Sequence, residues 1–140
     1  MTPLYAQAHD YSKYTVLAVD DIPLNLLLVE KMLSRFNFTL KKATGGQQAL
    51  DMIAEQKPAL ILLDLMMPGV DGFEVIRQVR ANPETADIQI VILSALNSNE
   101  DIVKGFNVGA NDFIMKPIIM EKLLTCVVTQ MALVEAKNKV

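Results

Sequence analysis

Four ionisable side chains stand at the ends of short apolar runs, where they could act together on a charged ligand. Asp64 ends the apolar run 59–63, Asp20 and Asp21 end a second run, and Lys116 ends a third. If these runs are parallel strands of one sheet, their carboxyl ends meet at one edge. Three carboxylates and an ammonium would then converge there. That arrangement suits a divalent cation and a phosphoryl group.

The residue types indicate which cation would bind. Crowded carboxylates repel one another unless a cation neutralises them. Oxygen ligands without a neighbouring histidine or cysteine favour magnesium, or manganese, over zinc. Magnesium keeps several waters and leaves positions open for phosphate oxygens. Asp20 and Asp21 could instead cap the helix expected after Pro23, but their combination with Asp64 and Lys116 favours the metal site.

A serine at the end of another apolar run is a further candidate. Ser94 could donate its hydroxyl to a phosphate oxygen, or it could simply make a local turn. These two interpretations have similar weight on the sequence alone. This set of residues contains no general base to activate the hydroxyl, so a serine nucleophile is not expected.

Short apolar runs alternate with longer amphipathic stretches, which is typical of strands alternating with helices. The pattern predicts strands at 15–20, 38–43, 59–64, 88–94 and 112–115. It predicts helices at 24–36, 46–56, 72–81, 99–108 and 118–135. Such alternation requires right-handed crossovers and a parallel sheet covered on both faces. The fold class is therefore α/β, a doubly wound (βα)5 sheet of five parallel strands in the order 2-1-3-4-5.

The chain length of 140 residues and the hydrophobic content of 51% are typical of one domain. We expect a flexible leader at 1–14, the folded domain at 15–135 and a C-terminal tail at 136–140. The chain has 13 basic and 16 acidic side chains. The basic side chains form no cluster in the sequence, so nucleic-acid binding is not indicated. No apolar run approaches the length of a membrane span. Cys126 is the single cysteine, which excludes an intrachain disulfide and favours a cytoplasmic protein.

The motifs together resemble the receiver domain of bacterial response regulators, which act in two-component and phosphorelay signalling. The resemblance covers about residues 15–135 and implies a flavodoxin-like fold. Its specificity comes from five separated motifs that occur in the right order. They are Val19-Asp20-Asp21, Asp64 to Gly69 with Asp71-Gly72, Ser94-Ala95, Gly109 to Phe113, and Lys116-Pro117.

The resemblance implies a role for each acidic residue. Asp64 would accept a phosphoryl group from a phosphohistidine on a sensor histidine kinase or a histidine phosphotransfer protein. Asp21, Asp64 and the backbone carbonyl of Met66 would bind Mg²⁺, with Asp20 acting through a metal-bound water. The chain would catalyse only its own phosphorylation and dephosphorylation.

The resemblance also implies a switch. Ser94 and Lys116 would hold the phosphate, and Phe113 would occupy the aromatic switch position. Phosphorylation would pull Ser94 inward and let Phe113 fill the vacated space. The surface that changes would consist of the helix 99–108, the strand 112–115 and the helix 118–135. The last helix is apolar around much of its circumference. Partial burial against the sheet explains most of this, and a homodimer on phosphorylation is the alternative interpretation.

Three residues depart from the commonest pattern of the family. Phe113 stands where many members have tyrosine, so its ring can move but cannot donate a hydrogen bond. Met66 and Leu96 are apolar at positions that are often polar. Both should flank the acyl phosphate and obstruct an attacking water, which predicts slow autodephosphorylation.

The first helix has more leucines than one buried stripe requires. Leu24 and Leu27, with Leu28 at the boundary, are expected on its outer side. They could be scattered surface leucines. The resemblance favours a docking patch for the phosphodonor beside the active edge.

Two other functions share this general architecture. A hydrolase that forms an aspartyl phosphate usually has a second acid two residues after the nucleophile, and Met66 occupies that position. A flavodoxin-like cofactor binder would need a hydroxyl- or glycine-rich phosphate loop after the first strand. Asp20 and Asp21 would repel a flavin phosphate there.

Overall fold

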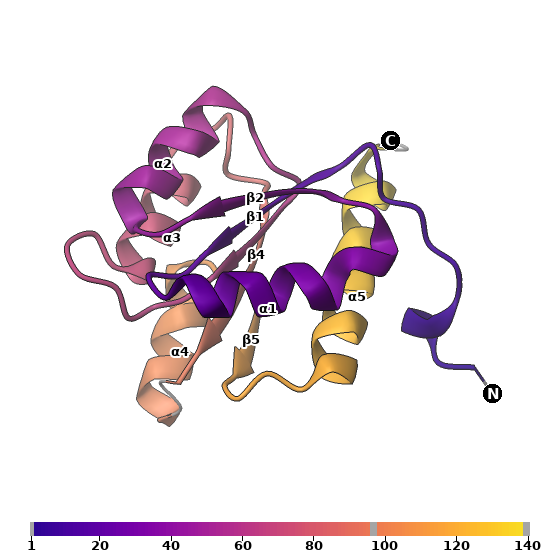
Figure 1. The fold of residues 1–140 in the computed structure, drawn as a ribbon. Coiled ribbons are helices and arrows are strands. Elements are labelled where there is room, and N and C mark those ends of the chain that lie inside the picture. Colours follow the sequence, from indigo (N-terminus) through magenta and orange to yellow (C-terminus); the bar gives the residue numbers. More distant parts are fainter. Residues whose placement is uncertain (1, 96–97, 139–140) are drawn as a thin grey trace.

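A computed structural model describes residues 2–95 and 98–138 (Figure 1). Five parallel strands form one sheet in the order β2-β1-β3-β4-β5, which confirms the predicted topology. The strands are β1 (Thr15–Val19), β2 (Thr39–Ala43), β3 (Leu60–Leu63), β4 (Gln89–Ser94) and β5 (Asp112–Met115). The helices are α1 (Pro23–Leu33), α2 (Gly46–Glu55), α3 (Gly72–Ala81), α4 (Asn99–Val108) and α5 (Met120–Asn138). Two 3₁₀ turns, η1 (Leu4–Ala6) and η2 (Ser34–Phe36), complete the described elements.

Two apolar clusters lie on opposite faces of the sheet. One contains side chains of α1 and α5, and the other contains side chains of α2 and α3. The central strands β3 and β4 are buried along their whole length, as expected for parallel strands covered on both faces. The edge strand β2 has exposed positions and carries Lys41 and Lys42. This agrees with the expectation that the second strand lies at an edge.

Gly72 allows α3 to begin directly against the end of β3. A Cβ atom on this residue would lie 2.5 Å from the carbonyl oxygen of Asp64, so a larger residue would push the helix away. Asp71 caps the same helix, since its side chain accepts a hydrogen bond from the Glu74 N–H at 2.9 Å. The start of α3 is therefore fixed directly beside the end of β3.

One residue of the segment before β1 packs into the core of the domain. Tyr11 is only 3% exposed and belongs to the cluster on the α1 and α5 face. Its N–H donates to the carbonyl of Phe36 at 2.9 Å, and its ring stacks on Phe38 with centroids 5.0 Å apart. Single aromatic side chains can anchor a segment without a repeating pattern, so periodicity gave no signal here. The division into a leader at 1–14, a domain and a tail stays a prediction.

Helix α5 begins at Met120 and extends to Asn138, so it is shifted towards the C-terminus relative to the expected 118–135. Lys137 fixes this end of the helix by donating to the carbonyl of Asp87 and to the side chain of Gln89. Within the described residues, no helix combines the length and apolar character that a membrane crossing requires.

Candidate functional site

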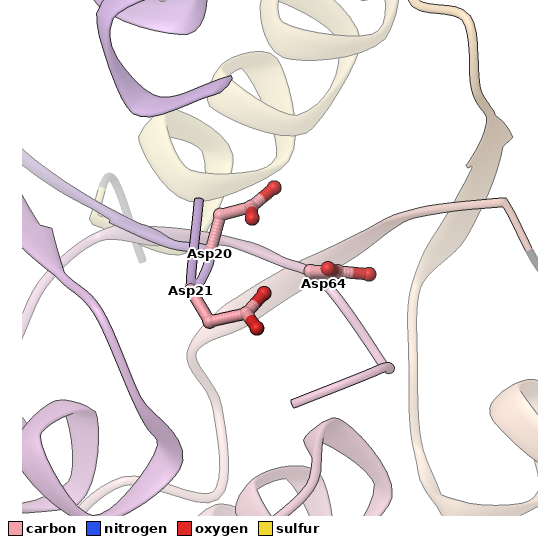
Figure 2. Close-up of side chains that lie close together, drawn as sticks. All are labelled: Asp20, Asp21 and Asp64. Atoms are coloured by element: carbon pink, nitrogen blue, oxygen red, sulfur yellow. The ribbon is translucent and has the colours of Figure 1, made fainter. Parts of the chain in front are cut away.

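Three carboxylates meet where β1 and β3 end (Figure 2). Asp20, Asp21 and Asp64 each offer an oxygen atom, and these atoms all lie within 4.8 Å of one another. The strand register explains why the carboxylates meet. Val19 at the end of β1 pairs with Leu63 at the end of β3, and an aspartate directly follows each strand. The sheet therefore brings together acids that are more than 40 positions apart in the chain.

Lys116 reaches the same point from β5. Its Nζ lies 2.8 Å from Oδ2 of Asp20 and 3.7 Å from Oδ2 of Asp64. Its backbone N–H donates to the carbonyl of Ser94 at 2.9 Å, which holds the end of β5 against the end of β4. The four ionisable side chains thus converge at the carboxyl edge of the sheet, as the parallel-strand argument predicts.

Two of the three carboxylates are buried, and the site has an excess of negative charge. Asp20 and Asp64 are each 6% exposed, whereas Asp21 is more open to solvent. Burial raises the pKa of Asp64, while Lys116 and the Met66 N–H act in the opposite direction and the two other carboxylates add to the rise. Three carboxylates and one ammonium leave a net charge of −2 when all are ionised. One divalent cation would neutralise that charge.

The donor set also fits the cation expected from the sequence. The three clustered side chains are carboxylates, and hard oxygen donors suit magnesium or manganese. The backbone after Asp64 turns back towards it, since the Met66 N–H lies 3.3 Å from Oδ1 of Asp64. The Met66 side chain is 59% exposed, so it lies at the surface.

The two predicted switch residues lie in different environments. Ser94 is fully buried at the end of β4. Phe113 on β5 is half-buried and packs against the cluster on the α2 and α3 face. Helix α4 approaches closely at Gly105, where a Cβ atom would lie 2.8 Å from Ile92 and 3.5 Å from the Phe113 ring. Leu96, the other apolar residue expected near the acyl phosphate, lies outside the described residues.

The three leucines of the expected docking patch are exposed on α1. Leu24, Leu27 and Leu28 are all open to solvent. Leu28 also lines a mostly apolar groove of about 210 Å³ between α1 and the segment after β5. The remaining lining residues of this groove are Asn25, Met32, Lys116, Pro117 and Ile118. The exposed face of α1 therefore continues into a groove that reaches Lys116.

One polar residue of the site was not identified from the sequence. The Asn25 amide donates to Oδ2 of Asp20 at 3.1 Å. Asn25 lies in the first turn of α1, and a polar side chain in the turn after an acidic pair is the signal that would have indicated it. Its contact depends on the direction in which α1 leaves the strand, which no periodic pattern encodes.

Comparison with known proteins identifies the family. A sequence model of the response regulator receiver domain matches residues 16–128. Over 103 residues the chain is 43% identical to response regulator PleD of Caulobacter vibrioides, covering 74% of this chain and 23% of that protein. It is 37% identical over 109 residues to the DNA-binding dual master transcriptional regulator RpaA of Synechocystis, covering 78% of this chain and 45% of RpaA. A solved structure of a putative response regulator from Chloroflexus aurantiacus matches with a TM-score of 0.81 and 30% identity, covering 85% and 98% of the two chains.

The chain spans about a quarter of PleD and less than half of RpaA. The name of RpaA describes a DNA-binding protein, so the expectation that nucleic acid is not a partner is not confirmed. Receiver domains take phosphoryl groups from histidine kinases. From its matched sequence, its sheet order and the cluster of aspartates at the sheet edge, this chain belongs to the response regulator receiver domain family, with the phosphoacceptor role of that family.

Proposed function

We propose that Asp64 takes a phosphoryl group from the phosphohistidine of a sensor histidine kinase or a histidine phosphotransfer protein, in a magnesium-dependent reaction. The observation that supports this most strongly is the convergence of Asp20, Asp21 and Asp64 with Lys116 at one edge of the sheet. Asp64 is the acid that follows the buried strand β3, at the centre of this edge.

The transfer breaks the N–P bond of the phosphohistidine and forms a P–O bond to a carboxylate oxygen of Asp64. Its transition state is loose, so positioning and charge neutralisation supply most of the rate. The Lys116 ammonium, already 3.7 Å from the Asp64 carboxylate, offsets charge on the transferred group. The hydroxyl of Ser94, at the end of the adjacent strand, donates to a phosphate oxygen once the acyl phosphate has formed.

Asp21, Asp64 and the backbone carbonyl of Met66 would hold Mg²⁺, and Mn²⁺ could replace it. Asp20 would act through a water. When bound, the cation neutralises part of the charge shared by the carboxylates and the incoming phosphoryl group. The net charge of −2 on the metal-free side chains supports a divalent ion in this position.

Phosphorylation would change the surface formed by α4, β5 and α5. The inward shift of Ser94 and the movement of Phe113 would bias this surface between two states, because only the phosphorylated state makes the new contact to Ser94. Large apolar side chains are already exposed there, and they offer a surface for homodimer formation or for another partner. They are Val103, Phe106, Met115 and Met120, with Ile119 directly before α5.

The phosphodonor would dock on α1 through Leu24, Leu27 and Leu28. Their exposure and the adjoining groove that reaches Lys116 support this surface. A helix of the donor lying along this face would bring its phosphohistidine to the edge of the sheet. Apolar anchors of this kind are typical of helix-in-groove recognition.

An aspartyl-phosphate hydrolase is the second candidate function. Such hydrolases usually have a second acid two residues after the nucleophile, whereas the residue two positions after Asp64 is the exposed Met66. The two functions differ in the fate of the phosphorylated protein. We expect incubation with acetyl phosphate and Mg²⁺ to add one phosphoryl group to the intact mass of the wild type and none to Asp64→Ala. Continuous release of phosphate without accumulation of the phosphorylated protein would favour the hydrolase.

A further inference from the structure

The carboxylate of Asp20 is held by donors from three parts of the chain. Its Oδ1 accepts the Ile22 N–H at 2.9 Å. Its Oδ2 accepts the Lys116 ammonium at 2.8 Å and the Asn25 amide at 3.1 Å. Asp20 is nearly buried, so these donors rather than solvent set its orientation.

The contacts of Asn25 close a ring in the turn between β1 and α1. The Asn25 N–H donates to the Ile22 carbonyl at 3.0 Å. Ile22 in turn donates to Asp20, and the Asn25 side chain returns to the same carboxylate. A side chain anchored through its own backbone in this way keeps its direction when its neighbours move.

The Lys116 ammonium is not fixed to a single partner, because it lies close to two carboxylates. It lies 2.8 Å from Asp20 and 3.7 Å from Asp64. A phosphoryl group on Asp64 would add negative charge on the side of the more distant partner. The ammonium is a mobile point charge on a flexible stem and would follow that charge. Asp20 would then keep one of the two donors on its Oδ2.

We propose that Asn25 is a positioning residue that holds the Asp20 carboxylate in place when Lys116 turns to the phosphoryl group on Asp64. This inference rests on the proposed function. Asn25 is a neutral donor, so it holds the carboxylate without reducing the negative charge that attracts a divalent cation. A lysine or arginine in its place would lower that charge and compete for the phosphoryl group.

The proposal predicts that an Asn25 variant loses binding affinity for a phosphoryl mimic but keeps its affinity for Mg²⁺. The probe is beryllium trifluoride, a small mimic of an acyl phosphate that needs no docking surface. Its affinity is measured at saturating Mg²⁺, and Mg²⁺ affinity is measured separately without the mimic. Asn25→Ala should weaken binding of the mimic about tenfold, the size expected for one hydrogen bond to a charged group. Mg²⁺ affinity should change by less than about threefold, because Lys116 still holds Asp20 in that state.

Two further variants separate this effect from general damage. Asn25→Leu has a similar volume, also lacks the donor, and should reproduce the loss. Gln78→Ala is the matched control, since the Gln78 amide donates to the Glu74 carboxylate on the exposed face of α3 at 2.8 Å. It should bind both probes like the wild type. Thermal unfolding of each variant reports whether the fold is intact.

Two outcomes would overturn the positioning role of Asn25, and a third would count against the proposed function. Equal affinity of wild type and both Asn25 variants for the mimic would overturn the positioning role and leave the proposed function standing. A loss of the same factor for Mg²⁺ and for the mimic would also overturn it, since Asn25 would then act on the resting site. Failure of the wild type itself to bind the mimic with Mg²⁺ would instead count against the proposed function.

Discussion

The Lys116 ammonium lies 2.8 Å from Oδ2 of Asp20 and forms an ion pair with it. Both side chains are largely buried, so this contact is screened less than a surface pair. The proposed phosphoacceptor is the more distant partner of the same lysine, at 3.7 Å. In the resting site Lys116 therefore restrains the acidic cluster, and it needs only a small movement to meet a phosphoryl group.

Removing this lysine should destabilise the metal-free protein. Lys116→Met leaves two nearly buried carboxylates without their cationic partner, which should lower the free energy of unfolding by about 1–3 kcal/mol. Added Mg²⁺ should restore much of the difference, because it supplies positive charge to the same oxygens. Chemical denaturation with and without Mg²⁺ measures both effects. Unchanged stability of the variant in the absence of metal would contradict the restraining role of Lys116.

Neutralising Asp64 should stabilise the metal-free protein, with a defined pH dependence. Burial raises the pKa of this carboxyl in the folded state. The folded protein therefore binds the proton more tightly than the unfolded chain does, and stability is lost as the pH rises through the raised pKa. Asp64→Asn lacks this carboxylate and avoids the loss of stability. Its free energy of unfolding should therefore exceed that of the wild type once the pH rises above the ordinary pKa of a carboxyl group, and the difference should persist at neutral pH.

Unfolding measured across that pH range tests the effect, and Asp51→Asn on the surface of α2 is the control. The control removes an exposed carboxylate outside the acidic cluster, so a change in stability that both variants share is not specific to the buried site. Saturating Mg²⁺ should shrink the difference between Asp64→Asn and wild type, because the wild type binds the cation better. An Asp64→Asn variant that is less stable than wild type at neutral pH without metal would contradict the electrostatic account.

We expect the acyl phosphate to be long-lived, because the two residues predicted to lie beside it, Met66 and Leu96, are apolar. Met66 is exposed two residues after Asp64, and Leu96 is the second apolar residue expected near the acyl phosphate. The double variant Met66→Asn, Leu96→Glu gives an attacking water polar partners and should release phosphate about tenfold faster, equivalent to about 1.4 kcal/mol of barrier. Phosphate release after removal of the donor measures the rate. Equal rates in wild type and variant would exclude this explanation.

A charge on the outer face of α1 should weaken the docking of a protein donor. Leu27→Asp places a carboxylate in the exposed leucine patch and should lower affinity for a phosphorylated histidine phosphotransfer protein about tenfold or more. Phosphorylation by acetyl phosphate should be unaffected, because this small donor does not use the patch. Leu4→Asp in η1 is the control, since it places the same charge at an exposed leucine outside α1 and outside the α4, β5 and α5 surface. Unchanged affinity of Leu27→Asp for the protein donor would show that the donor does not bind the exposed leucine patch.

The sequence predicts most of the sheet and its acidic edge, and the reason is physical. A strand buried on both faces, such as β3, must be apolar throughout, so the charged residue that ends it is easy to locate. The parallel topology then determines which strand ends meet, and the structure brings Asp20, Asp21, Asp64 and Lys116 together as that topology requires. The apolar runs and the charged residues that end them can thus be recognised locally in the sequence, and together with the topology they predict which side chains meet in the fold.

Contacts that depend on the relative placement of elements were not predictable in this way. The expected helix 24–36 is divided in the structure, because α1 ends at Leu33 and a 3₁₀ turn leads to Asn37 with a φ of 63°. Asn25 reaches Asp20 because of the angle at which α1 leaves the turn. Tyr11 enters the core by stacking on Phe38, a contact between residues that belong to no shared pattern. Each of these depends on tertiary geometry rather than on period or propensity.

The most direct test of the central claim is to map the phosphoryl group by peptide-resolved mass spectrometry after incubation with acetyl phosphate. We predict a single modified residue, Asp64, in the presence of Mg²⁺, and no modification when the metal is chelated. A phosphoryl group on any other residue, or modification of Asp64 that persists without a divalent cation, would contradict the account.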